Sequence, residues 1–355
     1  MHADDVSLEE KVRFLASARS YPDGTASVVA VETHMSWVFL TDRHAYKLKK
    51  PVRYTYLDFS SLAARRTFCE AEVRLNRRLA ASVYLGTVAL TRGQDGSLAL
   101  GGEGEAVEWL VEMRRLRRET MLEERIRAGT LLPEEVDAVA ARLAEFYRSL
   151  APVPIPPREY VDRFAAEIAA SHAELSRDAY ALDAGRLEAL RRSQVDALTA
   201  LGARLGARGS RVVEGHGDLR AEHVWLEHPP VVIDCLEFDR ELRLVDPLDD
   251  LGFLALECTR LGRPDIESRL LDAYVRSTQD AVDGALLRFY QSIRAVLRAR
   301  LAIQHLREAR FLGSDHWRER AQAYIELALG QCRSSGPAAV STARRSAAPD
   351  PGRPR

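Results

Sequence analysis

The 355-residue chain lacks any run of about 18 consecutive apolar residues, and its first residues lack the pattern of a secretory signal. Its four cysteines are far apart in the sequence and include no Cys-x-x-Cys pair; they are Cys69, Cys235, Cys258 and Cys332. This spacing argues against a disulfide framework or a structural zinc site and is typical of reduced thiols. We therefore expect a cytoplasmic protein with no membrane-spanning segment.

An excess of positive charge is also missing. The chain has 51 Lys and Arg against 52 Asp and Glu, which gives a formal net charge of −1 at pH 7. Binding to a nucleic-acid backbone needs a basic excess, so we expect no nucleic-acid partner. A hydrophobic content of 46% over this length is enough for a substantial core with two lobes or domains, and the sequence leaves the oligomeric state open.

Two glycine-containing nucleotide signatures are absent. No lysine follows a glycine, which excludes the Gly-Lys-Ser/Thr loop of P-loop kinases. The stretches Gly102–Gly104 and Gly215–Gly217 begin like a dinucleotide-binding Gly-x-Gly-x-x-Gly loop, but both lack the third glycine. A Rossmann-type site is therefore not predicted, and the first stretch is interpreted as a hairpin turn.

Lysine is scarce. Only four of the 51 basic residues are lysines, and three of these four crowd into Ala45–Lys50 (AYKLKK). An ammonium group is a compact point charge whereas a guanidinium is a broad planar fork, so a phosphate site can require lysine specifically. A solvated basic strand end is the alternative for such a run. Because arginine is used almost everywhere else, the phosphate site is favoured.

The most informative segment runs from His216 to Asp234. His216-Gly-Asp218 places an aspartate on a tight turn, and His223, five residues after Asp218, can bind a metal. Two short apolar runs, separated by a Pro-Pro turn, end at Asp234 and predict a hairpin that brings both aspartates to neighbouring strand ends. Phosphoryl transfer needs one carboxylate beside the acceptor hydroxyl and another that holds the metal bridging the phosphates.

These motifs resemble the aminoglycoside phosphotransferase / choline kinase family, which are small-molecule kinases with the protein-kinase fold. The family has His-Gly-Asp followed five residues later by Asn, then Ile-Asp, then Gly-Asp-Pro-x-x-Asp-Leu. The chain has these elements in this order but departs at two positions: His223 replaces the metal-binding Asn, and Val245 replaces the Gly before Asp246-Pro. Asp246 and Asp250 are predicted to orient the catalytic turn from behind.

The resemblance implies an α+β, two-lobed protein-kinase-like fold, with a small antiparallel β N-terminal lobe and a larger, mostly helical C-terminal lobe. We expect a nucleotide-binding lobe over residues 1–113, a helical lobe with the catalytic loop over 114–333, and a disordered tail over 334–355. A capping box over Ser7–Glu10 predicts the first helix. Strands are predicted at 27–33, 37–41, 45–49 and 107–113, and helices at 61–80, 133–150, 159–176, 184–207, 251–261, 265–277, 282–306 and 316–330.

The resemblance also assigns roles to single residues. Asp218 would accept the proton of the acceptor hydroxyl, and Asp234 would hold the metal, with His223 as the candidate second ligand. Lys47 follows a small residue by two positions on the third strand and would bind the α- and β-phosphates. Lys49 lies two residues further along the same strand face and is the alternative.

Three further residues complete the predicted nucleotide site. Glu72 stands seven residues before Leu79-Ala80, as the lysine-pairing glutamate does in the family helix. Ser36 lies between the first two strands, where it would offer a hydroxyl and backbone N–H groups to phosphate or serve only as a hairpin residue. The backbone around Met113 would contact the adenine.

The function predicted from the resemblance is ATP-dependent transfer of the γ-phosphoryl group to a hydroxyl of a small molecule. The cofactors would be ATP and Mg²⁺, with Mn²⁺ as the alternative because the imidazole of His223 suits it better. Glu237 and Asp239 add acidity that would suit a cationic acceptor, or they are surface charges on a loop. The identity of the acceptor is left open.

Two other functions and several roles of His223 stay open. The chain could be a nucleotide-binding pseudokinase or regulatory protein, because the Asn-to-His change weakens a Mg²⁺ site. A metal-dependent hydrolase would use His216, Asp218, His223 and Asp234 as ligands, but has no use for the lysine strand. His223 itself would bind metal directly or through water, contact phosphate as a cation, or pack near the turn.

Overall fold

The computed structural model describes residues 6–54, 57–308, 311 and 313–333. The chain forms two compact units, one made of Met1–Val161 and Ala203–Asp283 and the other of Asp162–Gly202 and Gly284–Arg355. The predicted lobe boundary at residue 113 stays a prediction, and the predicted tail over 334–355 lies outside the described residues. No helix in the described part of the chain is long and apolar enough to cross a membrane.

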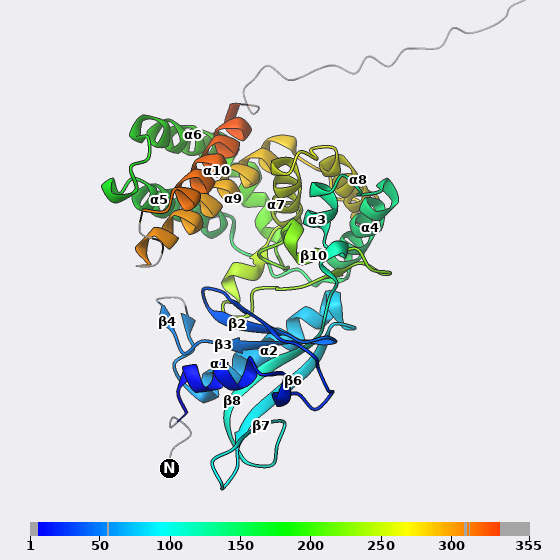
Figure 1. Cartoon of the computed structure of the whole chain (residues 1–355). Helices are drawn as coiled ribbons and strands as arrows, with labels where there is room; N and C mark the ends of the chain where they lie inside the picture. Colours follow the sequence, from blue (N-terminus) through cyan, green and yellow to red (C-terminus); the bar gives the residue numbers. More distant parts are fainter. Residues whose placement is uncertain (1–5, 55–56, 309–310, 312, 334–355) are drawn as a thin grey trace, which may run out of the picture. The chain divides into compact units, whose positions relative to one another are not determined.

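The first unit contains a six-stranded antiparallel sheet with the order β1-β2-β3-β8-β6-β7 (Figure 1). Its strands are β1 (Val29–Glu32), β2 (Ser36–Leu40), β3 (His44–Lys49), β6 (Tyr84–Arg92), β7 (Leu98–Leu100) and β8 (Glu105–Arg114). The four predicted strands are confirmed as β1, β2, β3 and β8, whereas the sequence-based prediction lacks β6 and β7. The stretch Gly102–Gly104 connects β7 to β8, but the prediction of a hairpin turn there is wrong, because β6 lies between these two strands in the sheet and pairs with both.

One face of this sheet packs against α1 (Leu8–Leu15). Ser7 caps the helix by accepting the backbone N–H of Glu10 at 3.2 Å, so the predicted capping box is confirmed. Leu15 of the helix lies in one apolar cluster with Tyr46 and Leu48 of β3. These two strand residues are two positions apart, as the period of a β-strand requires for side chains that share a face.

The other face of the sheet packs against α2 (Leu62–Ala80), which begins at its N-cap Ser61. Ala45 of β3 and Val73 of α2 belong to the apolar cluster on this side. Lys47 and Lys49 alternate with the residues that face α1, so they share the face of Ala45 and extend toward α2. The alternation along one strand therefore directs two ammonium groups to the helix that carries the predicted glutamate.

The rest of the first unit consists of short strand pairs and four helices. The strand pairs are β4 (Arg53–Tyr54) with β5 (Leu57–Asp58), β9 (Val213–Glu214) with β12 (Leu244–Val245), and β10 (Val224–Trp225) with β11 (Val231–Val232). The helices are α3 (Leu122–Arg127), α4 (Pro133–Ser149), α7 (Pro247–Arg260) and α8 (Ile266–Thr278). All residues of α7 from Pro247 to Cys258 are buried, so this helix is the centre of the helical part.

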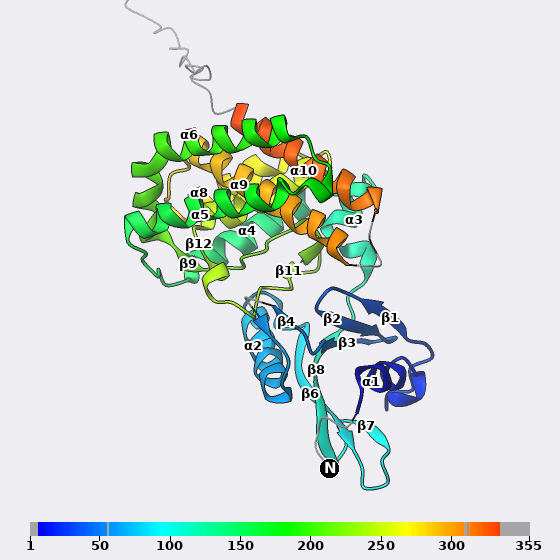
Figure 2. The same cartoon turned by 90° about the vertical axis from the view of Figure 1, so that its left-hand side faces the viewer.

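The second unit is helical and contains most of α5 (Pro157–Leu175) and α6 (Ala184–Arg208), with α9 (Gly284–Gln304) and α10 (Asp315–Arg333) (Figure 2). Its core is aromatic: the ring of Phe164 lies 5.5 Å from that of Phe289 and 5.6 Å from that of Tyr290. Each of these helices matches a predicted one to within a few residues.

Candidate active site

The turn that carries Asp218 connects β9 to a short 3-10 helix, Ala221–His223. Gly217 in this turn has a φ of +85°, and a Cβ there would lie 2.7 Å from the carbonyl oxygen of Leu242. A side chain would therefore meet both backbone strain and a backbone clash. The His-Gly-Asp sequence thus has a local structural reason for its glycine.

Asp250 of α7 fixes this turn from behind. Its buried carboxylate accepts the backbone N–H of His216 at 2.7 Å and that of Gly217 at 3.1 Å, as the sequence predicts. Asp246 caps the same helix and accepts two hydrogen bonds of 2.6 Å from Arg208. Asp246 thereby supports the helix that carries Asp250.

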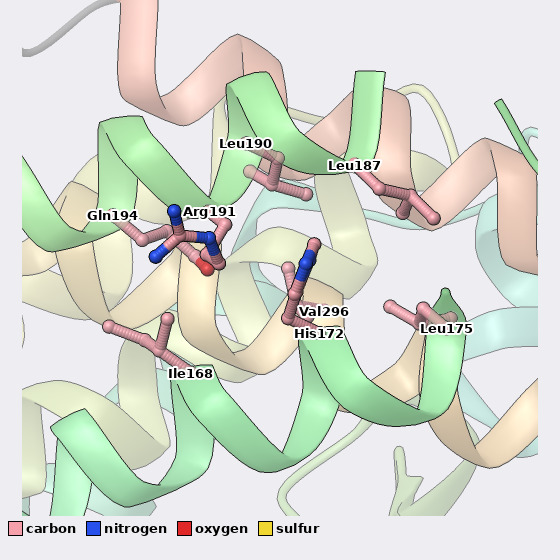
Figure 3. Close-up of a pocket in the computed structure, with 8 residues that line it drawn as sticks. All are labelled: Ile168, His172, Leu175, Leu187, Leu190, Arg191, Gln194 and Val296. Carbon is pink, nitrogen blue, oxygen red and sulfur yellow. The ribbon is translucent and has the colours of Figure 1, made fainter. Parts of the chain in front are cut away.

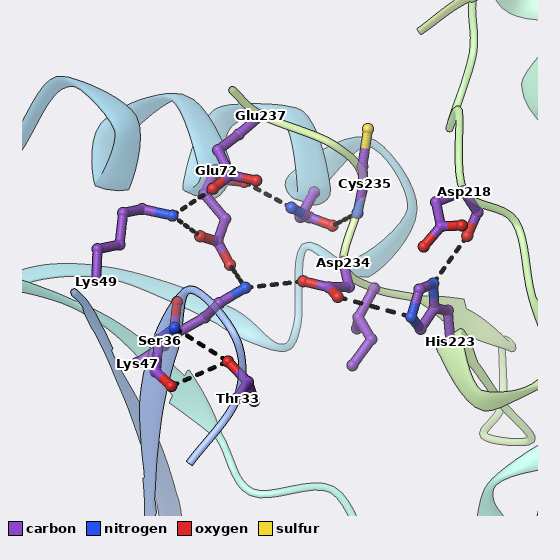
Figure 4. A network of polar contacts seen from close by, with 12 residues as sticks. Thr33, Ser36, Lys47, Lys49, Glu72, Asp218, His223, Asp234, Cys235 and Glu237 are labelled. Carbon is purple, nitrogen blue, oxygen red and sulfur yellow. Dashed lines mark hydrogen bonds and ion pairs between the residues drawn. The ribbon is translucent and has the colours of Figure 1, made fainter. Parts of the chain in front are cut away.

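Lys47 joins three segments of the first unit at one point (Figure 4). Its Nζ lies 2.9 Å from Oε1 of Glu72 on α2 and 2.8 Å from Oδ1 of Asp234, just past β11. Lys47 and Asp234 are 187 positions apart in the sequence. The structure therefore brings together the predicted phosphate-binding lysine, its predicted partner and the predicted metal carboxylate.

Opposite charges keep these three groups ionised. Burial would raise the pKa of Glu72, but Lys47 and Lys49 outweigh burial and lower it. Burial would lower the pKa of Lys47, yet Asp234 and Glu72 raise it well above its usual range. Desolvation would raise the pKa of Asp234, and the ammonium of Lys47 is the largest of the causes that hold it well below its usual range instead.

The backbone at Asp234 adopts a conformation that side-chain-bearing residues rarely take, with a φ of +63°. Neighbouring groups hold it there: the N–H of Asp234 donates to the Tyr84 hydroxyl at 3.2 Å, and the N–H of Cys235 donates to Oδ1 of Asn76 at 2.9 Å. Strained backbone of this kind clusters at functional sites. It turns the Asp234 carboxylate toward Lys47 while 44% of its side-chain surface stays exposed.

Lys49 is the deeper of the two lysines. Its side chain is completely buried and its Nζ contacts Oε2 of Glu72 at 2.6 Å and Oε1 of Glu237. The Lys47 side chain is 17% exposed and contacts Asp234. The geometry therefore favours Lys47 over Lys49 as the group that meets phosphate, although this assignment stays a prediction.

His223 presents one ring nitrogen to Asp234. Its Nδ1 lies 2.8 Å from the backbone oxygen of Asp218. Because a carbonyl only accepts, Nδ1 carries the proton, and Nε2 accepts from the guanidinium of Arg220 at 2.9 Å. The same Nε2 lies 3.6 Å from Oδ2 of Asp234. The nitrogen with the lone pair is therefore the one that faces the predicted metal carboxylate.

Arg220 is a site residue that the sequence reasoning missed. Its Nε donates to Oδ2 of Asp218 at 3.0 Å, and its other nitrogens contact Glu222 and His223. Burial would lower the pKa of its guanidinium, but Asp218 and Glu222 raise it. Its place two residues after the aspartate of the turn was the available signal. Arg220 thus orients the predicted base and touches the predicted metal ligand.

His216 is structural. Its Nδ1 accepts the backbone N–H of Asp218 at 3.3 Å, and its Nε2 lies 2.9 Å from the backbone oxygen of Ile233. Burial lowers the pKa of His216 to about 4, so the ring is neutral and both nitrogens are engaged. Within the described ranges, no three His, Cys, Asp or Glu residues are grouped to hold a metal ion. The four-ligand arrangement on which the hydrolase alternative depends is therefore not formed.

The remaining predicted residues, Ser36 and Met113, lie at the edges of the site. The backbone N–H of buried Ser36 donates to Oγ1 of Thr33 at 3.0 Å, which closes the turn between β1 and β2. Met113 is the next-to-last residue of β8 and lies in the apolar cluster that also contains Ala45 and Trp225. Contact of Ser36 with phosphate and of the Met113 backbone with adenine stays a prediction.

The charge of the site suits an additional cation. The group of side chains around Lys47, which is buried except at Asp234, has two ammonium groups and three carboxylates; they are Lys47, Lys49, Glu72, Asp234 and Glu237. Ions inside a protein need partners of opposite sign, so the extra negative charge favours a cation. Oδ2 of Asp234 lies 3.6 Å from Nε2 of His223, whose lone pair accepts from Arg220. Asp234 therefore offers an oxygen ligand for a divalent metal, whereas His223 offers a nitrogen ligand only when its hydrogen bond to Arg220 is released.

A shallow hollow in the second unit is a weaker candidate site (Figure 3). Apolar side chains of α5, α6 and α9 line most of it, with His172, Arg191 and Gln194 as its polar members. Arg191 pairs with Glu188 at 2.7 Å, and Gln194 donates to Ser292 at 3.0 Å. These contacts account for the guanidinium and the amide as parts of helix packing, so the hollow is not assigned a function.

Comparison with known proteins gives one set of related sequences. No protein-family model matches the chain. Uncharacterised proteins of Mycobacterium tuberculosis and Mycobacterium bovis are 36% identical over 276 residues, which is 76% of this chain and 53% of the relative. The chain therefore spans about half the length of the curated relatives that it matches.

Solved structures identify the fold. A choline kinase from Cryptosporidium parvum has a TM-score of 0.53 and 10% identity, covering 91% of this chain and 95% of its own. A choline/ethanolamine kinase family protein from Mesorhizobium loti has a TM-score of 0.52 and 16% identity, with 92% and 99% covered. The chain has the kinase-like fold. Spectinomycin phosphotransferase in complex with ADP and spectinomycin has a TM-score of 0.50 and 13% identity, with 92% and 99% covered. The α+β kinase-like fold expected from the sequence resemblance is thus confirmed.

Within this kinase-like fold, the sequence reasoning missed several residues that position the site. Tyr84 and Asn76 hold the backbone at and after Asp234, and Arg220 holds Asp218. Asn76 stands four positions after Glu72, on the same side of α2, which is the signal that could have found it. Tyr84 begins the strand β6, which the sequence-based prediction lacks.

Proposed function

We propose that the chain is an ATP-dependent phosphotransferase that transfers the γ-phosphoryl group to a hydroxyl of a small molecule. The observation that carries this proposal is the meeting of Lys47, Glu72 and Asp234 in the unit that also holds the Asp218 turn. Phosphoryl transfer needs an ammonium for phosphate, a group to hold that ammonium, and a carboxylate for metal. The solved proteins with this fold, described as choline kinases and a spectinomycin phosphotransferase with ADP, support the same class of reaction.

In this proposal the chain contributes mainly positioning and charge. Lys47 binds the α- and β-phosphates while Glu72 keeps its ammonium in place. Asp218 accepts the proton of the acceptor hydroxyl as the new bond to phosphorus forms. Arg220 orients the Asp218 carboxylate through the 3.0 Å contact to Oδ2.

Asp234 and His223 would hold the divalent cation. The fit rests on the 3.6 Å separation of Oδ2 and Nε2 and on the excess negative charge of the group around Lys47, and it requires Arg220 to release Nε2 when the cation binds. A bound Mg²⁺ or Mn²⁺ would neutralise phosphate charge. Because imidazole is a softer ligand than an amide oxygen, His223 shifts the preference of the site toward Mn²⁺.

The apolar cluster beside Lys47 is the proposed place of the base. Val38 pairs with Lys47 across β2 and β3, and Ala45 is two residues from it. Both belong to the cluster of Met113, Trp225 and Ile233, and Ile233 immediately precedes Asp234. A flat apolar base therefore has a surface next to the charges that would hold its phosphates.

A nucleotide-binding pseudokinase is the second candidate function. The contacts of Arg220 with both Asp218 and His223 favour it, because they engage the proposed base and the proposed metal ligand together. Such a protein would bind ATP through Lys47 and Asp234 but would transfer phosphate to no acceptor. The two candidates differ in turnover and agree in nucleotide binding.

The test is ATP binding with Mg²⁺ or Mn²⁺, followed by a screen of amino- and hydroxy-compounds for phosphorylation. We expect metal-dependent ATP binding and phosphorylation of at least one acceptor class. Trp225→Phe provides a check on the base site, because nucleotide should change the tryptophan fluorescence of the wild type more than that of this variant. Binding without turnover across the panel favours the pseudokinase, and absence of nucleotide binding overturns both candidates.

A further inference from the structure

The charges around Lys47 form an alternating row in which each ammonium lies between two carboxylates (Figure 4). Its order is Asp234, Lys47, Glu72, Lys49 and Glu237. Glu72 divides its two oxygens between the two lysines, with Oε1 to Lys47 and Oε2 to Lys49. A pair of Lys47 and Glu72 alone would not require Lys49 and Glu237.

The row fastens the segment Asp234–Glu237 at both ends. One lysine holds Asp234 and the other holds Glu237, and Asn76 accepts the N–H of Cys235 between them at 2.9 Å. Asn76 in turn donates to the backbone oxygen of Glu72 at 2.9 Å. The segment itself has no helical or strand structure after β11 ends at Val232. Apart from the N–H of Leu236, which lies 3.4 Å from the backbone oxygen of His216, side-chain contacts supply the order that regular backbone hydrogen bonds supply elsewhere.

We propose that Lys49 and Glu237 are a positioning pair that holds the Asp234 segment in its metal-binding geometry and keeps Glu72 neutralised while Lys47 engages phosphate. The inference rests on the proposed function, because it assigns a task to residues around the same site. The proposal assigns neither residue a contact with nucleotide. Each acts through Glu72 or Asp234.

The physical reason is competition for Lys47. Its ammonium has three N–H donors and already donates to Glu72 and Asp234. A phosphate group would compete with these carboxylates for the same donors. Glu72 is completely buried, and a buried carboxylate that loses its cation is strongly destabilised. Lys49 is also completely buried and stays on the other oxygen of Glu72, so Lys47 can turn toward phosphate without leaving Glu72 unpaired.

The test measures binding of a non-hydrolysable ATP analogue with Mg²⁺ and with chelator, and takes the ratio of the two affinities as the metal enhancement. We expect Glu237→Gln and Lys49→Met to lower this enhancement about 10- to 100-fold, the usual effect of residues that orient a metal ligand. Amide hydrogen exchange over 234–238 in the nucleotide-free chain should accelerate in both variants, because one end of the segment is released.

A double variant separates positioning from charge balance. Lys49→Met with Glu237→Gln removes one positive and one negative charge, so the net charge of the row is unchanged. We expect the double variant to recover thermal stability relative to Lys49→Met while its metal enhancement stays low. Recovery of both quantities would show that only charge balance matters and would overturn the inference.

Two control variants match the chemical changes. Glu70→Gln is the control for Glu237→Gln. Glu70 lies on α2 and pairs with Arg66, and the two side chains are 52% and 55% exposed, respectively. Lys11→Met removes another buried lysine, one that pairs with Glu108. Neither control should alter the metal enhancement, although Lys11→Met should lower stability.

Failure of this inference and failure of the proposed function are distinguishable. If wild type shows metal-enhanced binding and Glu237→Gln retains it, the positioning pair is overturned and the proposed function stands. If wild type shows no metal-enhanced binding, the proposed function fails. The exchange measurement then decides on the pair, because unchanged exchange over 234–238 in Glu237→Gln would exclude it.

Discussion

Two of the buried groups of charges in the first unit are centred on a glutamate that pairs with two cations, Glu108 and Glu72. They differ in whether a charged side chain at one end is exposed. Glu108 of β8 accepts Lys11 at 2.9 Å and Arg65 at 2.8 Å, and all three side chains are buried. The row around Lys47 is equally buried at Lys49 and Glu72 but ends at the half-exposed carboxylate of Asp234.

The comparison shows that burial of charge alone does not mark a functional site. The Glu108 group has two cations for one carboxylate, but it is closed, since each carboxylate oxygen has a cation and none of the three side chains is more than 7% exposed. The Lys47 row is open at one end and has an excess carboxylate. A closed group stabilises the fold, whereas an open one can exchange a protein partner for a ligand of matching charge.

The largest expected effect is a loss of phosphoryl transfer, and it distinguishes Asp218, the proposed base, from Asp234 at the open end of the row. Asp218→Asn should lower phosphoryl transfer about 10²- to 10⁴-fold while ATP affinity changes little, because a base acts on the acceptor. Asp234→Asn should remove transfer and also the metal dependence of ATP binding. Initial rates with a responsive acceptor and calorimetric ATP affinities check both. Substantial transfer by Asp218→Asn would contradict the role given to Asp218.

The next test compares the lysines of the two groups. Lys47→Met should weaken ATP binding about tenfold to a hundredfold, the value of one charge-assisted contact. Lys11→Met should leave ATP affinity unchanged but lower the free energy of unfolding by about 1.5–3 kcal/mol, because it removes one charged hydrogen bond to Glu108, which stays paired with Arg65. Titration calorimetry and denaturant unfolding measure the two quantities.

Two outcomes of that test would contradict the distinction drawn between the Lys47 row and the Glu108 group. If Lys49→Met weakens ATP binding as directly as the loss of a phosphate contact would, with and without metal, and Lys47→Met is silent, the phosphate-binding lysine lies two residues further along β3. If neither lysine matters, the open row is structural like the Glu108 group.

A pH titration of stability tests whether the buried imidazole of His216, beside Asp218, is neutral in the folded chain. The folded-state pKa of His216 is about 4, below its usual 6.5, because the ring is buried. The unfolded chain therefore binds the extra proton first, so the stabilisation is complete above about pH 6.5 and is lost as the pH falls toward 4. We expect this single group to remove about 3 kcal/mol of unfolding free energy over that range. His216→Gln should show a correspondingly flatter dependence in denaturant titrations from pH 4 to 7.

The smallest expected effect concerns the metal itself. If Nε2 of His223 binds the cation at the open end, His223→Asn should shift the Mn²⁺ to Mg²⁺ affinity ratio toward Mg²⁺ by a few-fold. Competition titrations with the two metals in the presence of ATP measure this ratio. An unchanged ratio in His223→Ala as well would assign His223 to packing against the Asp218 turn and leave Asp234 as the remaining side-chain ligand proposed.

The sequence predicts the fold where a pattern is local. Strands β1 to β3 and the long helices follow from alternation, helical spacing and caps such as Ser7 and Ser61. β6 escapes prediction because its middle residues are all half-buried, which weakens the two-residue period. The order of the sheet, which inserts β8 between β3 and β6, depends on pairing that no local pattern contains.

The site was predictable to the extent that its residues lie in short motifs. Asp218, Asp234 and the lysine strand were proposed in this way, and Glu72 from its distance to Leu79. The contact of Lys49 with Glu237 joins residues 188 positions apart, and a glutamate after a strand looks like any surface charge. Arg220 was missed because the chain uses arginine so widely that its place two residues after Asp218 did not distinguish it from the others.

Because Asp234 has a φ of +63°, stability and metal binding favour different residues at this position. Strain of this kind costs about 1–3 kcal/mol, and Asp234→Gly would relieve it. The same substitution would leave two cations and two carboxylates in the row. A variant library sorted for thermal stability should therefore lose the aspartate, whereas a library sorted for metal-dependent nucleotide binding should retain it. Deep sequencing of the two pools would show at this codon which demand keeps the residue in the chain.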